Sequence, residues 1–268
     1  MFCKSFPVSH GSSLVAKAAI VPIAIGTLAM LGMTAGAVSA SNIIYQDSFN
    51  RTGLLNASTP SPTDTGGATW TAGSSITTTA TSGGYASLTS ANSMAYLPFT
   101  PVSGNVYTLT ASLNPTPGTT TNWLALGFFP QSGSNASGAP LVGGGVVVLE
   151  RDNRGSQVFN GDQVGANGPT SPNSTGYTTW SITLNTTQSD WTASFSEDGV
   201  AGETNFQTFT YGGSNANPTI NTVGFGTDTM AGTVQDFTLT NSVPEPATLA
   251  LVAVSGLGLL LLKRRKTV

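Results

Sequence analysis

The stretch VYTLTASL, residues 106–113, alternates apolar residues with residues that carry a hydroxyl group. In an extended strand every second side chain lies on the same face. The apolar face would therefore hold Tyr107, Leu109, Ala111 and Leu113, and the hydroxyl face Thr108, Thr110 and Ser112. One buried face and one wet face are typical of an antiparallel strand. This stretch predicts an all-β fold.

Strands of this kind recur between residues 41 and 242. The alternation repeats in TWSITL (179–184) and DWTASFS (190–196). Two further stretches, NWLALGFF (122–129) and GVVVLE (145–150), are apolar on both faces, as in central strands that are covered on each side. Turn-forming residues interrupt the segment roughly every 8–12 residues, and no helical apolar period is sustained. We therefore expect about a dozen strands in one domain, a jelly-roll-like sandwich of two stacked antiparallel sheets.

The N-terminus has the pattern of a signal peptide. Lys4 and Lys17 lead into an apolar run that ends in the small residues Val38-Ser39-Ala40. This pattern predicts that residues 1–40 direct export through the Sec machinery and that signal peptidase cuts between Ala40 and Ser41. The alternative is an uncleaved anchor helix. The single cysteine of the chain, Cys3, lies in this segment, so the exported part can form neither a disulfide nor a thiolate metal site.

The charge of residues 41–242 excludes several classes of function. The segment has eleven acidic residues, three arginines, and neither lysine nor histidine. Such an acidic surface repels phosphate backbones, so we expect no nucleic acid partner. The missing residue types exclude a Ser-His-Asp triad, a histidine zinc site and a Schiff-base mechanism.

The C-terminus, VPEPATLALVAVSGLGLLLLKRRKTV (243–268), predicts a processed membrane segment. As a helix, residues 247–262 would be about 24 Å long, slightly shorter than a bilayer core of about 30 Å. A basic cluster follows: Lys263, Arg264, Arg265 and Lys266. It would stay in the cytoplasm, which places residues 41–242 outside. Immediately outside the membrane, two prolines would keep Pro244-Glu245-Pro246 extended and readable by an enzyme.

Residues 243–266 closely resemble the PEP-CTERM sorting signal of Gram-negative bacteria. The resemblance implies that an exosortase recognises Pro244, Glu245 and Pro246 while the helix and the basic cluster hold the substrate in the membrane. It also implies an inner-membrane-anchored precursor that becomes a protein of the cell surface or of an exopolysaccharide or biofilm matrix. A plain membrane anchor is the alternative. The segment 43–240, from IIYQDSFNRTG to TVQDFTLT, resembles the laminin-G/concanavalin-like jelly rolls of bacterial exported proteins.

A glycosidase is a remote alternative for the sandwich. Concanavalin-like glycosidases carry their carboxylates on one strand in the pattern Glu-x-Asp-x-x-Glu, whereas ERDNRGS offers Glu150 and Asp152 but has Gly155 where the third carboxylate belongs. We therefore expect these charges, with Arg151 and Arg154, to lie on an exposed hairpin.

The sandwich is predicted to be a non-catalytic interaction domain without a cofactor, and a lectin-like carbohydrate-binding domain that contacts extracellular polysaccharide is the main alternative. Calcium could be held by loop carboxylates, of which the sequence offers Asp152, Asp162, Asp198, Glu203 and Asp228. Exposed tryptophans could stack on sugar rings, with Trp70, Trp123, Trp180 and Trp191 as the candidates. Most of these tryptophans follow an apolar strand pattern, so we expect them to pack in the core.

Overall fold

Antiparallel strands form all of the regular secondary structure in the part of the chain that the structure describes. The computed structural model describes residues 41–64, 66–81, 83–116, 123–130, 145–151, 156–160, 163–167, 176–198, 207–227 and 231–243. All of them belong to one compact unit, Ala37–Val268. The strands are β1 (Ser41–Asp47), β2 (Gly53–Leu54), β3 (Pro62–Asp64), β4 (Thr71–Ala72), β5 (Ile76–Thr79), β6 (Tyr85–Leu88), β7 (Ser93–Pro98), β8 (Val106–Pro115), β9 (Trp123–Phe129), β10 (Val146–Arg151), β11 (Gln157–Asn160), β12 (Gln163–Asn167), β13 (Thr178–Asn185), β14 (Thr192–Asp198), β15 (Gln207–Thr210), β16 (Thr222–Thr227) and β17 (Gly232–Ser242).

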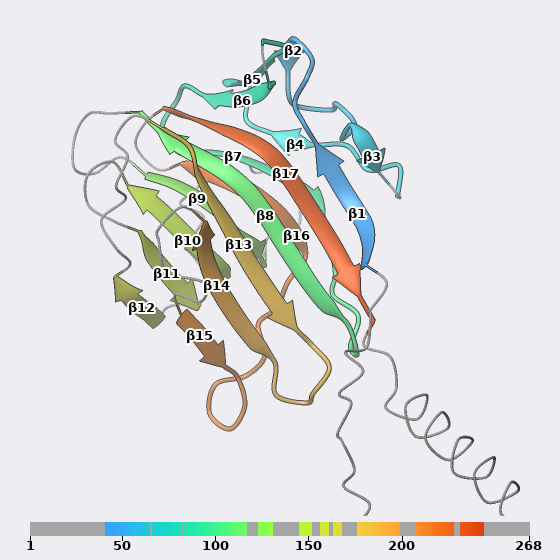
Figure 1. Ribbon diagram of the computed structural model, residues 1–268, viewed down its shortest axis with the longest axis vertical. Helices are drawn as coiled ribbons and strands as arrows, with labels where there is room; N and C mark the ends of the chain where they lie inside the picture. The colour runs from blue at the N-terminus through green and yellow to red at the C-terminus, as the bar shows by residue number, and fades with distance from the viewer. Residues whose placement is uncertain are drawn as a thin grey trace, which may run out of the picture. The chain divides into compact units, whose positions relative to one another are not determined.

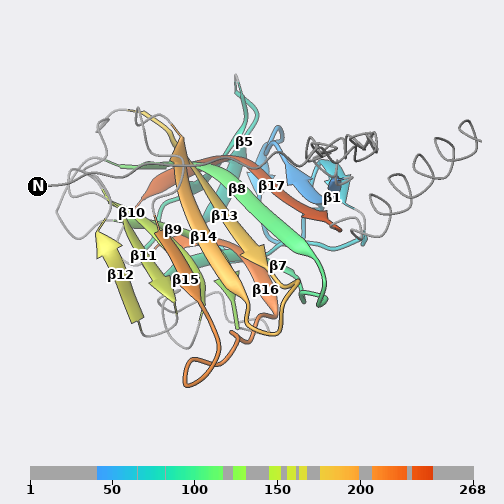
Figure 2. The ribbon, with the colours of Figure 1, turned by 60° about the horizontal axis from the view of Figure 1, so that its bottom comes forward.

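The strands form two sheets that stack face to face (Figure 1, Figure 2). Sheet A follows the order β15-β14-β13-β8-β17-β6-β5-β2, with β1 beside β17 and β3 beside β1. Sheet B follows the order β12-β11-β10-β9-β16-β7-β4. The predicted all-β jelly-roll sandwich is confirmed. The described strands outnumber the expected dozen because pieces as short as β2 and β4, of two residues each, give no periodic signal in the sequence.

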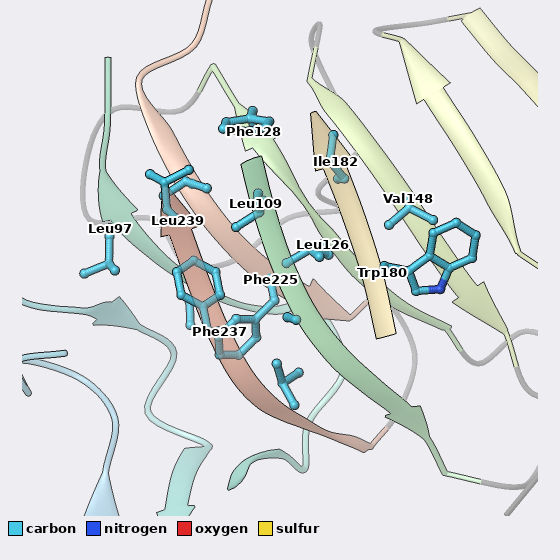
Figure 3. Close-up of a cluster of buried hydrophobic side chains, with 14 of the residues drawn as sticks. Leu97, Leu109, Leu126, Phe128, Val148, Trp180, Ile182, Phe225, Phe237 and Leu239 are labelled. Carbon is cyan, nitrogen blue, oxygen red and sulfur yellow. The ribbon is translucent and has the colours of Figure 1, made fainter. Parts of the chain in front are cut away.

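The stretch from which the fold was predicted is a central strand of sheet A. β8 pairs with β13 on one side and with β17 on the other. Its apolar side chains point between the sheets, where Leu109 lies opposite Leu126 and Phe128 of sheet B (Figure 3). Burial of this face against a second sheet is the main driving force for the fold.

The outer face of sheet A is covered with hydroxyl groups. Neighbouring strands place them in register, with Thr208, Ser194, Thr183, Thr108 and Thr240 in one row and Ser196, Ser181, Thr110 and Thr238 in the next. Neither row contains a charged or an aromatic side chain. Threonine suits a wet strand because its branched Cβ favours the extended backbone while its hydroxyl stays hydrated. We call these two rows the hydroxyl face.

The strands β9 and β10 are buried on both faces, as their sequences predicted. Leu126 and Val148 belong to the main core between the sheets, whereas Ala125 and Leu149 belong to a second apolar cluster on the other side of sheet B. This explains why both stretches are almost continuously apolar.

A fully buried carboxylate, that of Asp47, lies at the end of β1. The Asp47 side chain is fully buried, and its two oxygens accept hydrogen bonds from both terminal nitrogens of Arg51, at 2.8 and 2.7 Å. Its Oδ1 also accepts the Phe49 N–H (2.8 Å) and its Oδ2 the Trp70 indole N–H (2.7 Å). Phe49 has a φ of 52°, an uncommon backbone conformation for an aromatic residue, and Asp47 holds the turn in that conformation.

Asp47 holds two aromatic rings in the core, that of Phe49 in the turn and that of Trp70 just before β4. The Trp70 ring lies 5.3 Å from Phe225 of β16 and 5.0 Å from Phe237 of β17, centroid to centroid, so it contacts both sheets. Phe49 packs edge-on against Phe225 at 5.8 Å. Asp47 therefore anchors the aromatic cluster that joins the two sheets at this end.

Candidate functional site

The two ends of the described chain lie side by side in sheet A. Ser41, at the start of β1, is the register partner of Ser242, at the end of β17, and Asn42 is the partner of Asn241. Register partners on antiparallel strands have Cα atoms about 5 Å apart. The two segments with predicted targeting roles, residues 1–40 and residues 243–268, therefore leave the sandwich at the same end. Periodicity along the sequence gives no hint of this long-range pairing.

The predicted recognition triplet follows the last strand almost directly. Val243 is 54% exposed and is the one residue between the end of β17 and Pro244. The predicted recognition residues Pro244, Glu245 and Pro246 lie outside the described residues. So do Ala40, the predicted membrane helix 247–262, and the basic cluster Lys263, Arg264, Arg265 and Lys266. Within the described ranges there is no helix of the length and apolarity that a membrane span requires.

Glu150 corrects one prediction. It is not on an exposed hairpin but is 1% exposed and points into the space between the sheets, since it shares a face of β10 with the core residue Val148. The Trp180 indole N–H donates to its Oε2 at 2.8 Å. The error came from treating the charge as the end of a strand; because GVVVLE is apolar on both faces, no alternation in it assigns Glu150 to the inner or the outer side.

A second buried carboxylate borders the same indole. Glu197 of β14 is 2% exposed and is the register partner of Trp180 on β13. Directly opposing side chains on antiparallel strands have Cβ atoms about 5 Å apart. Glu150 and Glu197 thus approach Trp180 from sheet B and sheet A respectively. Glu197 was not among the predicted functional residues, although its alternation with Ala193 and Phe195 indicated that its side chain points inward.

We expect Trp180→Phe to destabilise the sandwich by about 2–3 kcal/mol, because it removes a donor to a buried carboxylate. Urea unfolding followed by circular dichroism measures the loss. Trp191→Phe is the matched control, since Trp191 is only partly buried beside the core, and we expect it to change stability by less than about 1 kcal/mol. Equal losses in both variants would contradict a specific role for the indole N–H.

The tryptophans lie mainly in the core, as expected. Trp70, Trp123 and Trp180 are buried, whereas Trp191 is partly exposed. The residues named for calcium cannot be placed in the same way, because Asp152, Asp162, Glu203 and Asp228 and the side chain of Asp198 lie outside the described residues. Among the side chains that are described, no three metal-ligating residues come together.

Tyr211 combines a buried ring with a hydroxyl that has no hydrogen-bond partner in the described part of the chain. Burial raises its pKa above the ordinary value of 10.0. The folded state therefore keeps the phenol protonated at a pH at which the unfolded chain ionises it. Above about pH 10 the unfolded state binds fewer protons than the folded state, so the stability falls as the pH rises.

We expect Tyr211→Phe to stabilise the sandwich by about 1 kcal/mol at neutral pH, because it removes a buried polar group that lacks a partner. Above pH 10 the variant should also lose stability less steeply than the wild type. Urea unfolding between pH 7 and pH 11 measures both effects. An unchanged alkaline slope would show that Tyr211 does not contribute to the loss.

Comparison with known proteins identifies a motif at the C-terminus. Residues 242–266 match the PEP-CTERM protein-sorting motif. The match begins at Ser242, the residue with which β17 ends and which pairs with Ser41. The PEP-CTERM motif makes the chain an exported, membrane-anchored precursor that an exosortase processes, as the resemblance of residues 243–266 predicted. The sandwich precedes the motif directly.

No curated protein matches the chain. Similar solved structures include an endo-1,3-β-glucanase from Streptomyces sioyaensis, with 14% identity, a TM-score of 0.45, and coverage of 77% of this chain and 98% of that one. A Bacillus subtilis protein of unknown function with a galectin-like fold has 13% identity, a TM-score of 0.47, and coverage of 78% and 100%. A Lotus tetragonolobus seed lectin has 13% identity, a TM-score of 0.41, and coverage of 69% and 96%. At this level of similarity no ligand or activity can be transferred to this chain.

Proposed function

We propose that this protein is a surface or extracellular-matrix protein of a Gram-negative bacterium, associated with exopolysaccharide or biofilm, and that its sandwich is a non-catalytic interaction domain. The PEP-CTERM match at 242–266 is the observation that carries the proposal. In this proposal exosortase recognises Pro244, Glu245 and Pro246, residues 247–262 span the membrane, and the cations at 263–266 hold the tail in the cytoplasm.

The strand pairing supports the proposed domain boundaries of 1–40, 41–242 and 243–268. β1 begins at Ser41, so signal peptidase cleavage between Ala40 and Ser41 would leave every pair of the β1–β17 ladder intact. A cut a few residues later would remove ladder partners of β17. Likewise, the triplet begins only after β17 ends at Ser242, so processing at the triplet would leave the sandwich whole.

The mass of the mature protein recovered from the producing cell tests both processing events at once. We expect a species that begins at Ser41 and has lost the segment that follows the triplet. A species that keeps residues 247–268 would contradict sorting and favour a plain anchor. A species that keeps residues 1–40 would contradict cleavage at Ala40.

The interior position of Glu150 supports a non-catalytic sandwich. A glycosidase needs two carboxylates that flank a sugar bond. Glu150 instead lies between the sheets and bonds to Trp180, while the neighbouring Arg151 is bonded to the Gln157 side chain (2.9 Å). If the sandwich degraded a polysaccharide and Glu150→Gln abolished that activity, the glycosidase alternative would be favoured instead.

The hydroxyl face favours a carbohydrate-binding domain as the second candidate function. Its two rows present neutral donors and acceptors, which suit an uncharged polysaccharide better than an ionic partner. We expect Thr183→Lys, at the centre of the first row, to weaken retention on the polysaccharide of the producing cell at least about tenfold, a loss of about 1.4 kcal/mol. Thr116→Lys, at the exposed position directly after β8, is the control. Equal retention of both variants would exclude this face.

A further inference from the structure

The end of the sandwich at which both chain termini emerge also carries exposed apolar side chains. Ile43 of β1 is 39% exposed, Val102 is 64% exposed, and Val243 is 54% exposed. The described residues contain only two other large hydrophobic side chains that are exposed, Leu54 and Tyr177. Scattered single apolar residues need no explanation, but three of them beside two membrane-linked chain ends do. We call Ile43, Val102 and Val243 the anchor face.

Hydrogen bonds fix Val102 next to the chain ends. The residue lies in the connection between β7 and β8, four positions before Val106, which is the register partner of Ser242. The Val102 N–H donates to the Tyr107 hydroxyl at 2.7 Å. The Thr186 hydroxyl donates to the Val102 carbonyl at 2.9 Å. A residue held at both backbone groups presents its exposed side chain in a fixed position.

Almost no charge surrounds the anchor face. The described segments beside it are 41–46, 62–64, 99–107, 186–191 and 238–243, and together they contain two charged residues, Asp64 and Asp190. Charged groups are expensive near the hydrocarbon of a bilayer, whereas small polar and apolar groups are tolerated. The composition of this end of the sandwich is therefore compatible with contact with a lipid surface.

The short connection between the sandwich and the predicted membrane helix leaves little room between this end of the sandwich and the membrane. Four residue steps join Val243 to Ala247, the first residue of the predicted membrane helix, and they reach at most about 14 Å when fully extended. The polar headgroup region takes up about 5–8 Å of that distance. The remaining gap is smaller than the diameter of a single helix.

We propose that in the precursor the anchor face lies against the outer surface of the membrane and contacts lipid through Val102 and Val243. The inference rests on the proposed function, in which residues 247–262 span the membrane. The end of the sandwich that carries Tyr177 then faces away from the membrane, since Thr178 and Asn185 pair with opposite ends of β8. Exosortase would have to reach the triplet in the narrow space under the domain.

A fluorophore at Val102 tests the contact. Cys3→Ser removes the only cysteine, so that Val102→Cys in the full chain can be labelled with an environment-sensitive dye and reconstituted into phosphatidylglycerol/phosphatidylethanolamine vesicles without exosortase. The matched control is Tyr177→Cys, since Tyr177 is exposed at the opposite end. We expect nitroxide-labelled headgroups to quench the dye at position 102 several-fold more than at position 177. Ser103→Cys gives an independent reading at the same site if labelling at 102 disturbs the fold.

The outcomes separate this inference from the proposed function. Vesicle flotation reports whether the chain is anchored at all, and failure to float would overturn both proposals. Flotation with equal quenching at positions 102 and 177 would overturn the anchor face alone. Quenching at position 102 that appears only when exosortase is reconstituted as well would show that the anchor face does not contact lipid in the precursor by itself, and would also overturn the inference.

Discussion

Asp47→Asn is expected to lower the free energy of unfolding of the sandwich by about 3–5 kcal/mol, because it breaks a buried ion pair from one side. The variant keeps the volume of the side chain but replaces one carboxylate oxygen by an NH₂ group. The Asp47 carboxylate accepts four hydrogen bonds, two from Arg51, one from the Phe49 N–H and one from the Trp70 indole N–H. The new NH₂ group would therefore face an N–H donor and could not accept from it. The Arg51 guanidinium, whose side chain is 24% exposed, also loses its counter-charge.

Urea unfolding of residues 41–243, followed by tryptophan fluorescence and by circular dichroism, measures the loss. Asp236→Asn is the matched control, since Asp236 is exposed and its φ of 52° suits asparagine equally well. We expect this control to stay within about 0.5 kcal/mol of the wild type. A loss below 1 kcal/mol for Asp47→Asn would mean that the aromatic cluster joins the sheets without the carboxylate.

The sequence predicted the faces of the strands better than it predicted which polar residues are buried. Alternation alone assigned the buried residues of β8, whereas Glu150 was expected on an exposed hairpin and the burial of Asp47 was not predicted. A carboxylate at an inner position reads as a break in the pattern unless its partner is known. Those partners are Trp70 and Trp180, which lie 23 and 30 residues farther along the chain. Only the folded chain reveals such distant partners.

At the two ends of the domain, the sorting motif could be predicted from the sequence, but the proximity of the chain ends could not. The order of a rigid triplet, an apolar segment and a cationic cluster is a local pattern, so the sequence alone predicted the sorting motif that the comparison found at 242–266. The proximity of Ser41 to Ser242 is a property of topology, because β1 and β17 occupy opposite ends of the domain sequence. Local chemistry thus indicates how the chain is processed, whereas the sheet indicates where the two proposed cleavage sites lie relative to each other.

The composition-preserving exchange Glu245→Pro with Pro246→Glu is expected to abolish processing and leave a full-length, membrane-bound precursor. The exchange keeps the charge and both prolines, so it leaves the hydrophobicity of the tail and the end of β17 at Ser242 unchanged. An enzyme that reads the triplet places a group opposite the Glu245 carboxylate, and a carboxylate moved by one residue, about 3.5 Å, leaves that group unpaired. Immunoblots of the membrane and extracellular fractions measure the result.

Val243→Ala controls for a general effect of substitution next to the triplet, and we expect it to be processed like the wild type. Export itself should be unaffected in both variants, because the predicted signal peptide and the basic cluster are intact. Protease accessibility of the sandwich from outside checks this. If the exchanged triplet is released as efficiently as the wild type, then Pro244-Glu245-Pro246 is only a spacer. The membrane helix and its cations would then be sufficient for recognition, and the link between the triplet and exosortase would have to be abandoned for this chain.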